Sequence, residues 1–477
     1  MLHRYFRLFL FILLAPGAFY SCKKLDNFTN QAVQLNFSTD TLNFDSLFGK
    51  LYNSTDSINM YPRSITLQVR VSNPSEYDVK TTISLAGNIY GFFRLNVDGR
   101  SGKQFDQIEI GAKDSIYIFV QASIDTIQVL GFQEINDQLL FETNGNKQAV
   151  AMVAYAQGSN FYSNKVLDCT KYDDMNWNSS KPYYLMDSVL VPKGCTLTID
   201  AGTHIYNYNN SAILVAGTLI VNGNISSPVI FEGSRLDDDY KELAGQWIGI
   251  RFLKGSTNNT MRGAVIKNAY IGIEIDSLSE NEKPNLVLEQ TVIKNMSAVG
   301  LLSYSGELKA SNNLIYNCGL FGLVGEFGGN YELTHNTVYL SNSGTVRKDP
   351  GIVFSNAPLR NENGTIRFSI PLNLTLTNNI FYGNLDNDFF INNDAEGAPI
   401  QNNIIASNLL KSKNAVYNSN GNLLSIDPQL KDIPNNDFDL KAGSPCKGSG
   451  KATSIFIDIL GRTRNSSNPS IGAFEGE

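Results

Sequence analysis

Residues 312–323 read NNLIYNCGLFGL: two asparagines, a short apolar run, a third asparagine, and a second apolar run after Gly319. An apolar pair followed closely by asparagine recurs along the second half of the chain, at spacings of 27, 22, 24, 42 and 24 residues. A repeat in the low twenties is typical of one coil of a β-solenoid, in which short strands stack on their counterparts in the next coil. The copies begin at Val265, Val292, Leu314, Val338, Ile380 and Ile404.

The one long spacing indicates a coil with an insertion. A spacing of 42 exceeds its neighbours of 24 by 18 residues, and the extra chain falls within 347–371, RKDPGIVFSNAPLRNENGTIRFSIP. Asn, Gly and Pro are frequent in this segment, as in loops. We therefore expect a loop that leaves the solenoid here and returns to it.

The recurrent asparagines suggest how the coils are held in register. An asparagine after each strand can adopt the left-handed conformation of a sharp corner. Its amide can also bond the equivalent amide one coil away, about 4.8 Å along the axis. The sequence therefore predicts a structural ladder of Asn268, Asn295, Asn317, Asn342, Asn384 and Asn408.

Residues 33–157 have a different pattern, in which apolar and polar residues alternate strictly, as in RSITLQVRVSNP and KDSIYIFVQ. Such alternation predicts strands that are buried on one face. Asn144-Gly145 separates two of these runs, and both residues tolerate the positive φ angles of a tight hairpin turn. We expect a β-sandwich of about seven strands.

The N-terminus has the order of an export signal. Arg4 and Arg7 precede the apolar run 8–14, which is too short to span a bilayer as a helix, and small residues follow before Cys22. The ending AFYSC resembles the lipobox of bacterial lipoproteins, which implies that residues 1–21 are removed and that Cys22 is lipidated. Residues 22–32 are polar and are predicted to be a tether. A plain signal peptide with an incidental cysteine is the alternative.

Net charge and cysteine content bear on the partners of the protein and on its disulfides. The net charge of −7 provides no basic field for nucleic acid, so nucleic acid is not an expected partner. Four cysteines remain after Cys22, and an exported protein meets an oxidising compartment. Cys169 with Cys195 is the preferred disulfide pair, while small buried thiols are the alternative.

Several stretches resemble a known family once the repeat is recognised. GTLIVNG, PVIFEG, GQWIGIRF, GGNYELTHNTV and SIGAFE look like segments of right-handed parallel β-helix lipoproteins of Bacteroidetes envelopes, and FFRLNVDG resembles their N-terminal Ig-like modules. The resemblance implies an all-β fold: an Ig-like β-sandwich over 33–157, a right-handed parallel β-helix over 160–425, and a C-terminal capping segment over 426–477. Because members range from polysaccharide lyases to adhesins, it does not name an activity.

The sequence has no motif of the known solenoid lyases or hydrolases, but it has one acidic loop. Asp237, Asp238 and Asp239 follow the strand PVIFEG, and their carboxylates suit Ca²⁺. Tyr240 and Trp247 are candidates for stacking on a sugar ring. The alternative is a solvated loop with a core-facing Trp247. His204 and His335 are interpreted as structural.

A third pattern is Asp-Ser/Thr followed by an aliphatic residue, which resembles the O-glycosylation acceptor of Bacteroidetes exported proteins. Turn chemistry at strand starts is the alternative. The candidate acceptors are Thr41, Ser46, Ser57, Ser115, Thr126, Ser188 and Ser277.

These observations favour an outer-membrane lipoprotein, on the surface or the periplasmic face, whose β-helix presents an extended surface for a ligand. A glycan is the ligand that fits best, because Asn, Tyr and Ser side chains bond hydroxyl groups. Two alternatives remain: a polysaccharide lyase or hydrolase with an atypical site, and an accessory subunit of an outer-membrane protein complex. No cofactor is required by the sequence, and Ca²⁺ is the only candidate.

Overall fold

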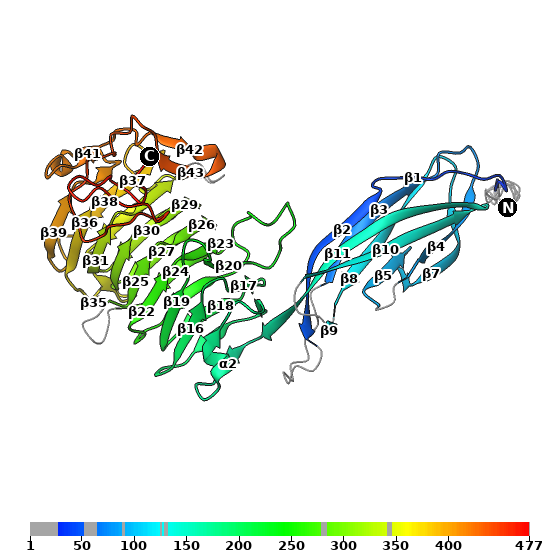
Figure 1. Ribbon diagram of the computed structural model, residues 1–477, viewed down its shortest axis with the longest axis horizontal. Helices are drawn as coiled ribbons and strands as arrows, with labels where there is room; N and C mark the ends of the chain where they lie inside the picture. Colours follow the sequence, from blue (N-terminus) through cyan, green and yellow to red (C-terminus); the bar gives the residue numbers. More distant parts are fainter. Residues whose placement is uncertain are drawn as a thin grey trace, which may run out of the picture. The chain divides into compact units, whose positions relative to one another are not determined.

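The computed structural model describes residues 27–51, 64–87, 91–124, 126–127, 132–277, 284–340 and 346–476. These residues form an almost purely β structure, which confirms the predicted fold class (Figure 1). The chain divides into two compact units, one of residues up to Phe44, Ser64–Ser123 and Glu134–Ala154, and a second that contains Tyr155–Glu477.

The first unit contains two antiparallel sheets that pack face to face. Phe37 lies 4.7 Å from Phe141, and Phe44 lies 5.3 Å from Phe93, measured between ring centroids, and each pair joins the two sheets. Asn144-Gly145 has the predicted positive φ angles at its turn. One sheet contains β1 (Asn36–Phe37), β3 (Ser64–Ser72), β8 (Ser115–Ser123), β5 (Phe93–Val97) and β6 (Arg100–Gly102). The other contains β2 (Thr41–Leu51), β11 (Asn146–Tyr162), β10 (Phe132–Thr143), β4 (Val79–Leu85) and β7 (Gln104–Ile110), with β9 (Thr126–Ile127) paired to β2.

The second unit is a parallel β-helix with three sheets, which we number 1 to 3. Sheet 1 continues from the end of β11 through β14 (Tyr183–Leu185), β17 (His204–Asn207), β20 (Val229–Gly233), β23 (Ala264–Lys267), β26 (Val292–Met296), β29 (Leu314–Cys318), β32 (Thr337–Leu340), β37 (Ile380–Gly383), β40 (Leu409–Leu410) and β41 (Leu423–Leu424). Sheet 2 contains β12 (Lys165–Val166), β15 (Val189–Val191), β18 (Ala212–Val215), β21 (Gly249–Phe252), β24 (Ile271–Ile275), β27 (Val299–Tyr304), β30 (Phe321–Glu326), β33 (Ile352–Ser355) and β38 (Phe389–Asn392). Sheet 3 contains β13 (Asn176–Trp177), β16 (Thr196–Asp200), β19 (Thr218–Asn222), β22 (Asn259–Arg262), β25 (Leu286–Glu289), β28 (Glu307–Ser311), β31 (Gly329–Thr334), β36 (Leu372–Thr377) and β39 (Ile400–Ala406).

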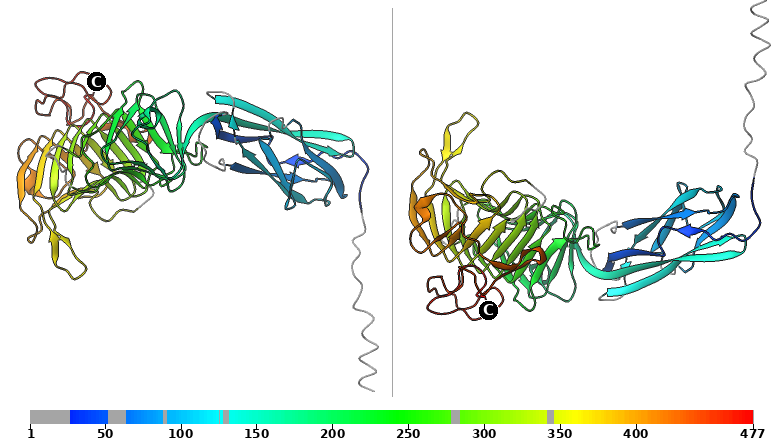
Figure 2. Two further views of the ribbon diagram at one scale, coloured as in Figure 1. Left: turned by 90° about the horizontal axis from the view of Figure 1, so that it is seen from below. Right: turned by 90° about the horizontal axis from the view of Figure 1, so that it is seen from above.

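The insertion in the long coil is divided between two places. Part of it precedes β33, and part forms the hairpin β34 (Leu359–Arg360) and β35 (Ile366–Phe368) between β33 and β36. Figure 2 shows this hairpin, in yellow, projecting from the side of the solenoid. The predicted loop thus contains a regular strand, β33, that keeps its place in sheet 2.

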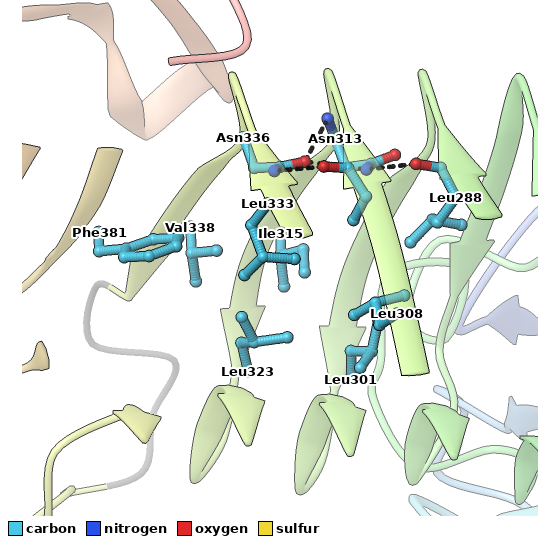
Figure 3. Close-up of a pocket in the computed structure, with 11 residues that line it drawn as sticks. Leu288, Leu301, Leu308, Asn313, Ile315, Leu323, Leu333, Asn336, Val338 and Phe381 are labelled. Atoms are coloured by element: carbon cyan, nitrogen blue, oxygen red, sulfur yellow. Dashed lines mark hydrogen bonds between the residues drawn. The ribbon is translucent and has the colours of Figure 1, made fainter. Parts of the chain in front are cut away.

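The three sheets enclose a continuous apolar core, because every second side chain of each strand points inward. Ile293, Ile315 and Val338 stack in successive coils, and all are buried. A gap near them, lined by Leu323 and Phe381 among others, is about 10 Å³, the lower limit for a single water molecule (Figure 3). A ligand at this level of the solenoid therefore has to bind on an outer face.

An asparagine ladder runs along the corner between sheet 3 and sheet 1. Nδ2 of Asn313 donates to Oδ1 of Asn336 at 2.9 Å (Figure 3), and the series continues through Asn379, Asn408 and Asn422 at 2.9, 2.9 and 3.2 Å. Each oxygen also accepts a backbone N–H at 2.8–3.1 Å, and each NH₂ group also donates to a carbonyl at 2.8–3.0 Å. The buried amides are thereby satisfied, which avoids a cost of about 1–3 kcal/mol for each group left without a partner.

The predicted ladder is correct for Asn408 and for the bond between Asn295 and Asn317, and it is wrong for Asn268 and Asn384. Asn268, Asn295 and Asn317 follow their strands and have the expected left-handed φ angles of 67°, 57° and 52°. Within the described residues of the predicted set, Asn317 donates to Asn295, one coil earlier. Asn268 bonds the carbonyls of Lys241 and Leu243, Asn295 bonds Glu242, Asn384 accepts from Arg347, and Asn342 lies outside the described residues. The ladder asparagines precede the apolar pair instead of following it.

The C-terminal segment packs along the side of the solenoid, whereas the sequence predicted a cap over its end. Leu430, Phe438, Ile471 and Phe474 pack with Leu314 and other outward residues of sheet 1. The segment includes β42 (Leu430–Asp432), the short helix η2 (Ile433–Asn435) and β43 (Asp437–Leu440). Apolar side chains on the outer face of sheet 1 therefore acquire a cover.

A run of the same segment bonds the left-handed residues that precede Thr291 and the ladder asparagines Asn313, Asn336 and Asn379. The partners are Asn378 with Lys451, His335 with Thr453, Asn312 with Ile457, and Gln290 with Asp458. The run thus crosses four successive coils in the direction opposite to their order in the chain.

The predicted cysteine pair is joined in the structure. Cys169 and Cys195 form a disulfide with Cα atoms 5.6 Å apart, which links the chain before the short helix α2 (Tyr172–Met175) to the chain before β16. Cys318 and Cys446 are buried and are not joined in a disulfide among the described residues. The first coils are therefore cross-linked, which restricts the unfolded chain over a separation of 26 residues.

Replacing Asn379 with Ala should lower the free energy of unfolding by about 2–4 kcal/mol, because the bonding groups of Asn336 and Asn408 lose partners in a buried site. Urea unfolding of the purified protein measures this. Asn435, an exposed asparagine, is the control, and its replacement with Ala should change stability by less than about 0.5 kcal/mol. Equal effects of the two substitutions would contradict a role for the ladder.

His335 should make stability depend on pH. Burial, with Arg464 nearby, lowers the pKa of His335 to about 3, whereas an unfolded histidine titrates near 6.5. The unfolded chain therefore binds a proton that the folded one does not, so stability should fall as the pH drops below about 6.5. His335→Asn, which matches Asn312 and Asn378 at the same corner, should reduce the stability lost between pH 7.5 and 4.5 in urea unfolding. An unchanged loss would contradict this.

Candidate functional site

The acidic loop after β20 is paired with basic neighbours. Nε of Arg235 lies 3.2 Å from Oδ2 of Asp237, and Nζ of Lys241 lies 2.6 Å from Oδ1 of Asp238. The main chain of Asp237 accepts two further bonds from the loop itself. Within the part of the chain that the structure describes, no group of three Asp, Glu, His or Cys side chains is placed to hold a metal ion. Asp239 therefore belongs to no such group. The loop therefore offers poor support for the calcium site that the sequence suggested.

The aromatic residues beside this loop do not form a sugar platform. Trp247 is 1% exposed, and its Nε1 donates to the carbonyl of Lys267 at 2.9 Å, so the prediction of a stacking role is wrong. Trp247 comes just before β21, and its side chain points inward to the core. One face of Tyr240 is covered by the guanidinium of Arg235.

The same loop is fixed to sheet 1 by Glu242. Its carboxylate lies 2.9 Å from Nζ of Lys294 and 3.6 Å from Nζ of Lys267. Burial opposes its ionisation, but the hydrogen bond from Lys294 and the charge of Lys267 keep the pKa of Glu242 below its usual value. The loop is thus part of the covering of sheet 1.

Sheet 3 carries an open polar groove of about 370 Å³ on its outer face. Parallel in-register pairing places Glu307 beside Asn330 and Asn330 beside Asn373. Their side chains form a hydrogen-bonded row: Asn330 donates to Glu307 at 2.9 Å, Asn373 to Asn330 at 2.6 Å, and Asn402 to Asn373 at 3.2 Å. We call these four residues the amide row.

A charged pair lies beside the amide row. Nζ of Lys309 and Oε1 of Glu332 are 2.9 Å apart, and both side chains are about half exposed, at 50% and 51%. The groove therefore presents amide donors, amide acceptors and one group of each charge to solvent.

The outer face of sheet 2 holds a second group of polar residues near one another. Nε of Arg251 is 2.9 Å from Asp276, and Nη2 is 3.5 Å from Glu274. Tyr304 pairs in register with Glu326 on the neighbouring strand. Burial raises the pKa of Glu274, opposed by the charge of Arg251, and burial also raises the pKa of Glu326.

Sequence reasoning missed both surfaces, although glycines at or near the start of five of the sheet 2 strands provide an alignment. Gly249, Gly272, Gly300, Gly322 and Gly351 precede the strands GIRF, GIEID, GLLSY, GLVGE and GIVFS. The second and fourth residues after each glycine then form the outward columns, which contain Arg251, Glu274, Asp276, Tyr304 and Glu326.

The proposed glycosylation positions differ in accessibility. Ser46 is 9% exposed, so a glycan does not fit there without opening the fold. Thr41 is exposed, and Ser115, Ser188 and Ser277 are partly exposed. Ser57 lies outside the described residues, as does the proposed lipidation site Cys22, and Thr126 lies in β9. In the described part of the chain, no helix has the length and apolar character needed to cross a membrane.

Comparisons with known proteins do not assign this chain to a family. No family model matches it, and no curated protein matches it. Among solved structures, a PapD-like domain of human CEP192 is 7% identical and aligns over 27% of this chain and 86% of its own, with a TM-score of 0.17. The CooA pilin subunit of enterotoxigenic Escherichia coli is 9% identical over 27% of this chain and 99% of its own, with a TM-score of 0.17.

A family 123 glycoside hydrolase from Clostridium perfringens is 5% identical over 28% of this chain and 30% of its own, with a TM-score of 0.18. Similarities at this level carry no argument about fold or function. The chemistry of the outer faces is therefore the basis for a functional proposal.

The acidic loop leads to a prediction about calcium. Because Asp237 and Asp238 already pair with Arg235 and Lys241, adding millimolar Ca²⁺ should leave the thermal unfolding midpoint unchanged. A triple variant in which Asp237, Asp238 and Asp239 are each replaced by Asn should show the same thermal response to Ca²⁺ as the native protein. A rise in the midpoint that the triple variant abolishes would restore the calcium site.

Proposed function

We propose that the protein is a cell-envelope lipoprotein, anchored through Cys22, whose β-helix binds an extended glycan in the groove of sheet 3. The observation that carries the ligand-binding part is the amide row, which spans four successive coils in an open groove. The anchoring part rests on the N-terminal sequence alone.

The amide row suits hydroxyl groups. An asparagine side chain has two N–H donors and two acceptor lone pairs. Asn330 and Asn373 each use one donor and one acceptor within the row, so one N–H and one lone pair of each remain for a ligand. A sugar hydroxyl can both donate and accept, and it therefore matches such a surface.

The regular spacing of the row favours a polymer over a small ligand. Neighbouring strands of a sheet lie about 4.8 Å apart, so side chains of similar type recur at that interval along the groove. Lys309 and Glu332 add a charged contact of each sign beside it. An extended chain can therefore meet several equivalent contacts, each weak, whose sum supplies the affinity.

Electrophoresis of the purified protein, without its leader, through native gels that contain neutral or acidic polysaccharides tests this proposal. At least one polysaccharide should retard the protein. Asn373→Ala should weaken that binding about tenfold, because two ligand contacts and the order of the row are lost. Thr260→Ala, an exposed position on the same face outside the groove, is the matched control and should bind like the native protein.

Two results would count against the groove: no retardation by any polysaccharide, or native binding by the Asn373 variant. Analysis of the same gels for shortened saccharides distinguishes binding from cleavage. Cleavage products would support the alternative of a polysaccharide-degrading enzyme.

A further inference from the structure

A short row of aromatic side chains lies at the corner between sheet 2 and sheet 3. The ring centroids of Tyr304 and Phe327 are 5.9 Å apart with planes at 23°, and those of Phe327 and Phe368 are 6.3 Å apart at 73°. The three rings come from the end of β27, from the corner after β30, and from the projecting hairpin. We call them the aromatic row. Phe368 is 37% exposed, and the other two rings are partly exposed.

Phe327 is a costly residue for its position. Its φ angle is 63°, in the left-handed region, where a bulky side chain is a genuine outlier. The corner itself requires this angle, since Ser305 has φ 57° at the same place one coil earlier. A serine, glycine or asparagine would fit the backbone better. Phe327 is not part of the buried core of the described residues, and its ring lies at the surface against Tyr304 and Phe368.

Three carboxylates lie near Tyr304, one end of the aromatic row. Glu326 directly precedes Phe327 and pairs in register with Tyr304. Glu274 and Asp276 lie on the preceding strand and share the single guanidinium of Arg251. Three carboxylates against one guanidinium give a local charge of −2 when all are ionised (1 − 3 = −2). In the described part of the chain, Glu326 forms no ion pair, and its carboxylate accepts a hydrogen bond from Ser355.

The charge and the rings together define the chemistry of a fitting ligand. An ammonium group gains from a nearby aromatic face, since the face of the ring is electron-rich. A carboxylate without an ion-pair partner gains from the same group. The apolar face of a sugar ring packs against an aromatic ring. The aromatic row also borders the groove of sheet 3, because Glu307 and Asn330 lie three residues after Tyr304 and Phe327.

We propose that the aromatic row, with Glu326, binds a positively charged amino sugar of a glycan, with its ring on Phe327 and its ammonium group at Glu326. The site lies on different residues from the amide row, but the choice of a sugar as the ligand rests on the proposed function. Glu274 and Asp276 add negative charge near the site, which attracts a cationic ligand, and Arg251 holds the two side chains in position.

Phe327→Asn is the decisive variant. Asparagine adopts the left-handed conformation readily, as Asn295 and Asn317 do at another corner, so the variant should unfold at the same or a higher urea concentration than the native protein. Any loss of binding then reports the missing ring. Glu326→Gln keeps the shape of the side chain and removes its charge.

Calorimetric titration of the full protein with a glucosamine trimer and with the matched N-acetylated trimer measures both parts of the site. The native protein should bind the glucosamine trimer about tenfold more tightly than the acetylated one, which has no ammonium group. Phe327→Asn should weaken binding of the glucosamine trimer at least about fivefold. Glu326→Gln should remove most of the preference between the two trimers.

Equal affinity for the two trimers, or native affinity in the Phe327 variant, would overturn the inference. Trilysine that binds as tightly as the glucosamine trimer would overturn the assignment to a sugar. The groove is tested separately: Asn373→Ala should weaken polysaccharide binding, whereas Phe327→Asn should weaken binding of the glucosamine trimer. Binding of the glucosamine trimer without retardation in any polysaccharide gel would leave the aromatic site in place and remove the groove.

Discussion

The rest of the second unit depends on one constraint: each strand pairs in parallel, and in register, with its counterpart in the next coil. Each coil must turn at its corners without leaving a buried polar group unbonded, because a single unsatisfied amide costs a large part of the stability of a protein. The ladder from Asn313 to Asn422 meets this requirement by bonding each amide to the next coil. Once the register is fixed, every outward side chain also has a fixed neighbour in the next coil. The outward side chains therefore form columns along each outer face.

The three outer faces differ because they are covered differently. Sheet 1 carries apolar and aromatic side chains that pack beneath the C-terminal segment and the loop with Glu242. Sheet 3 keeps an open groove with the amide row. Sheet 2 combines charged side chains at one level with apolar ones such as Leu302 and Val324 at the next. Open polar surface therefore remains on sheets 2 and 3 and at the corner between them.

The repeat period and the strands could be read from the sequence, because alternation and spacing are local properties. The ladder could be read only in part. Asparagines lie on both sides of the apolar pair at Leu314, and the sequence pattern alone does not say that the continuous ladder runs through Asn313 and not through Asn317. The path of the C-terminal segment was also hidden, since its contacts join residues more than 70 positions apart, such as Asn378 and Lys451. The amide row and the aromatic row arise from register between distant strands, and no local motif marks them.

The crossing of four coils by residues 451–458 has a further consequence. Solenoids commonly gain or lose coils by duplication or deletion of a repeat, since each coil contacts only its neighbours. Here four successive coils each bond a different residue of one continuous stretch, so the spacing of the coils has to match the spacing of their partners. The bonds come from Gln290, Asn312, His335 and Asn378. A duplicated coil between β25 and β36 would displace every later contact. The number of coils in this region is therefore set by the length of the chain that runs beside them.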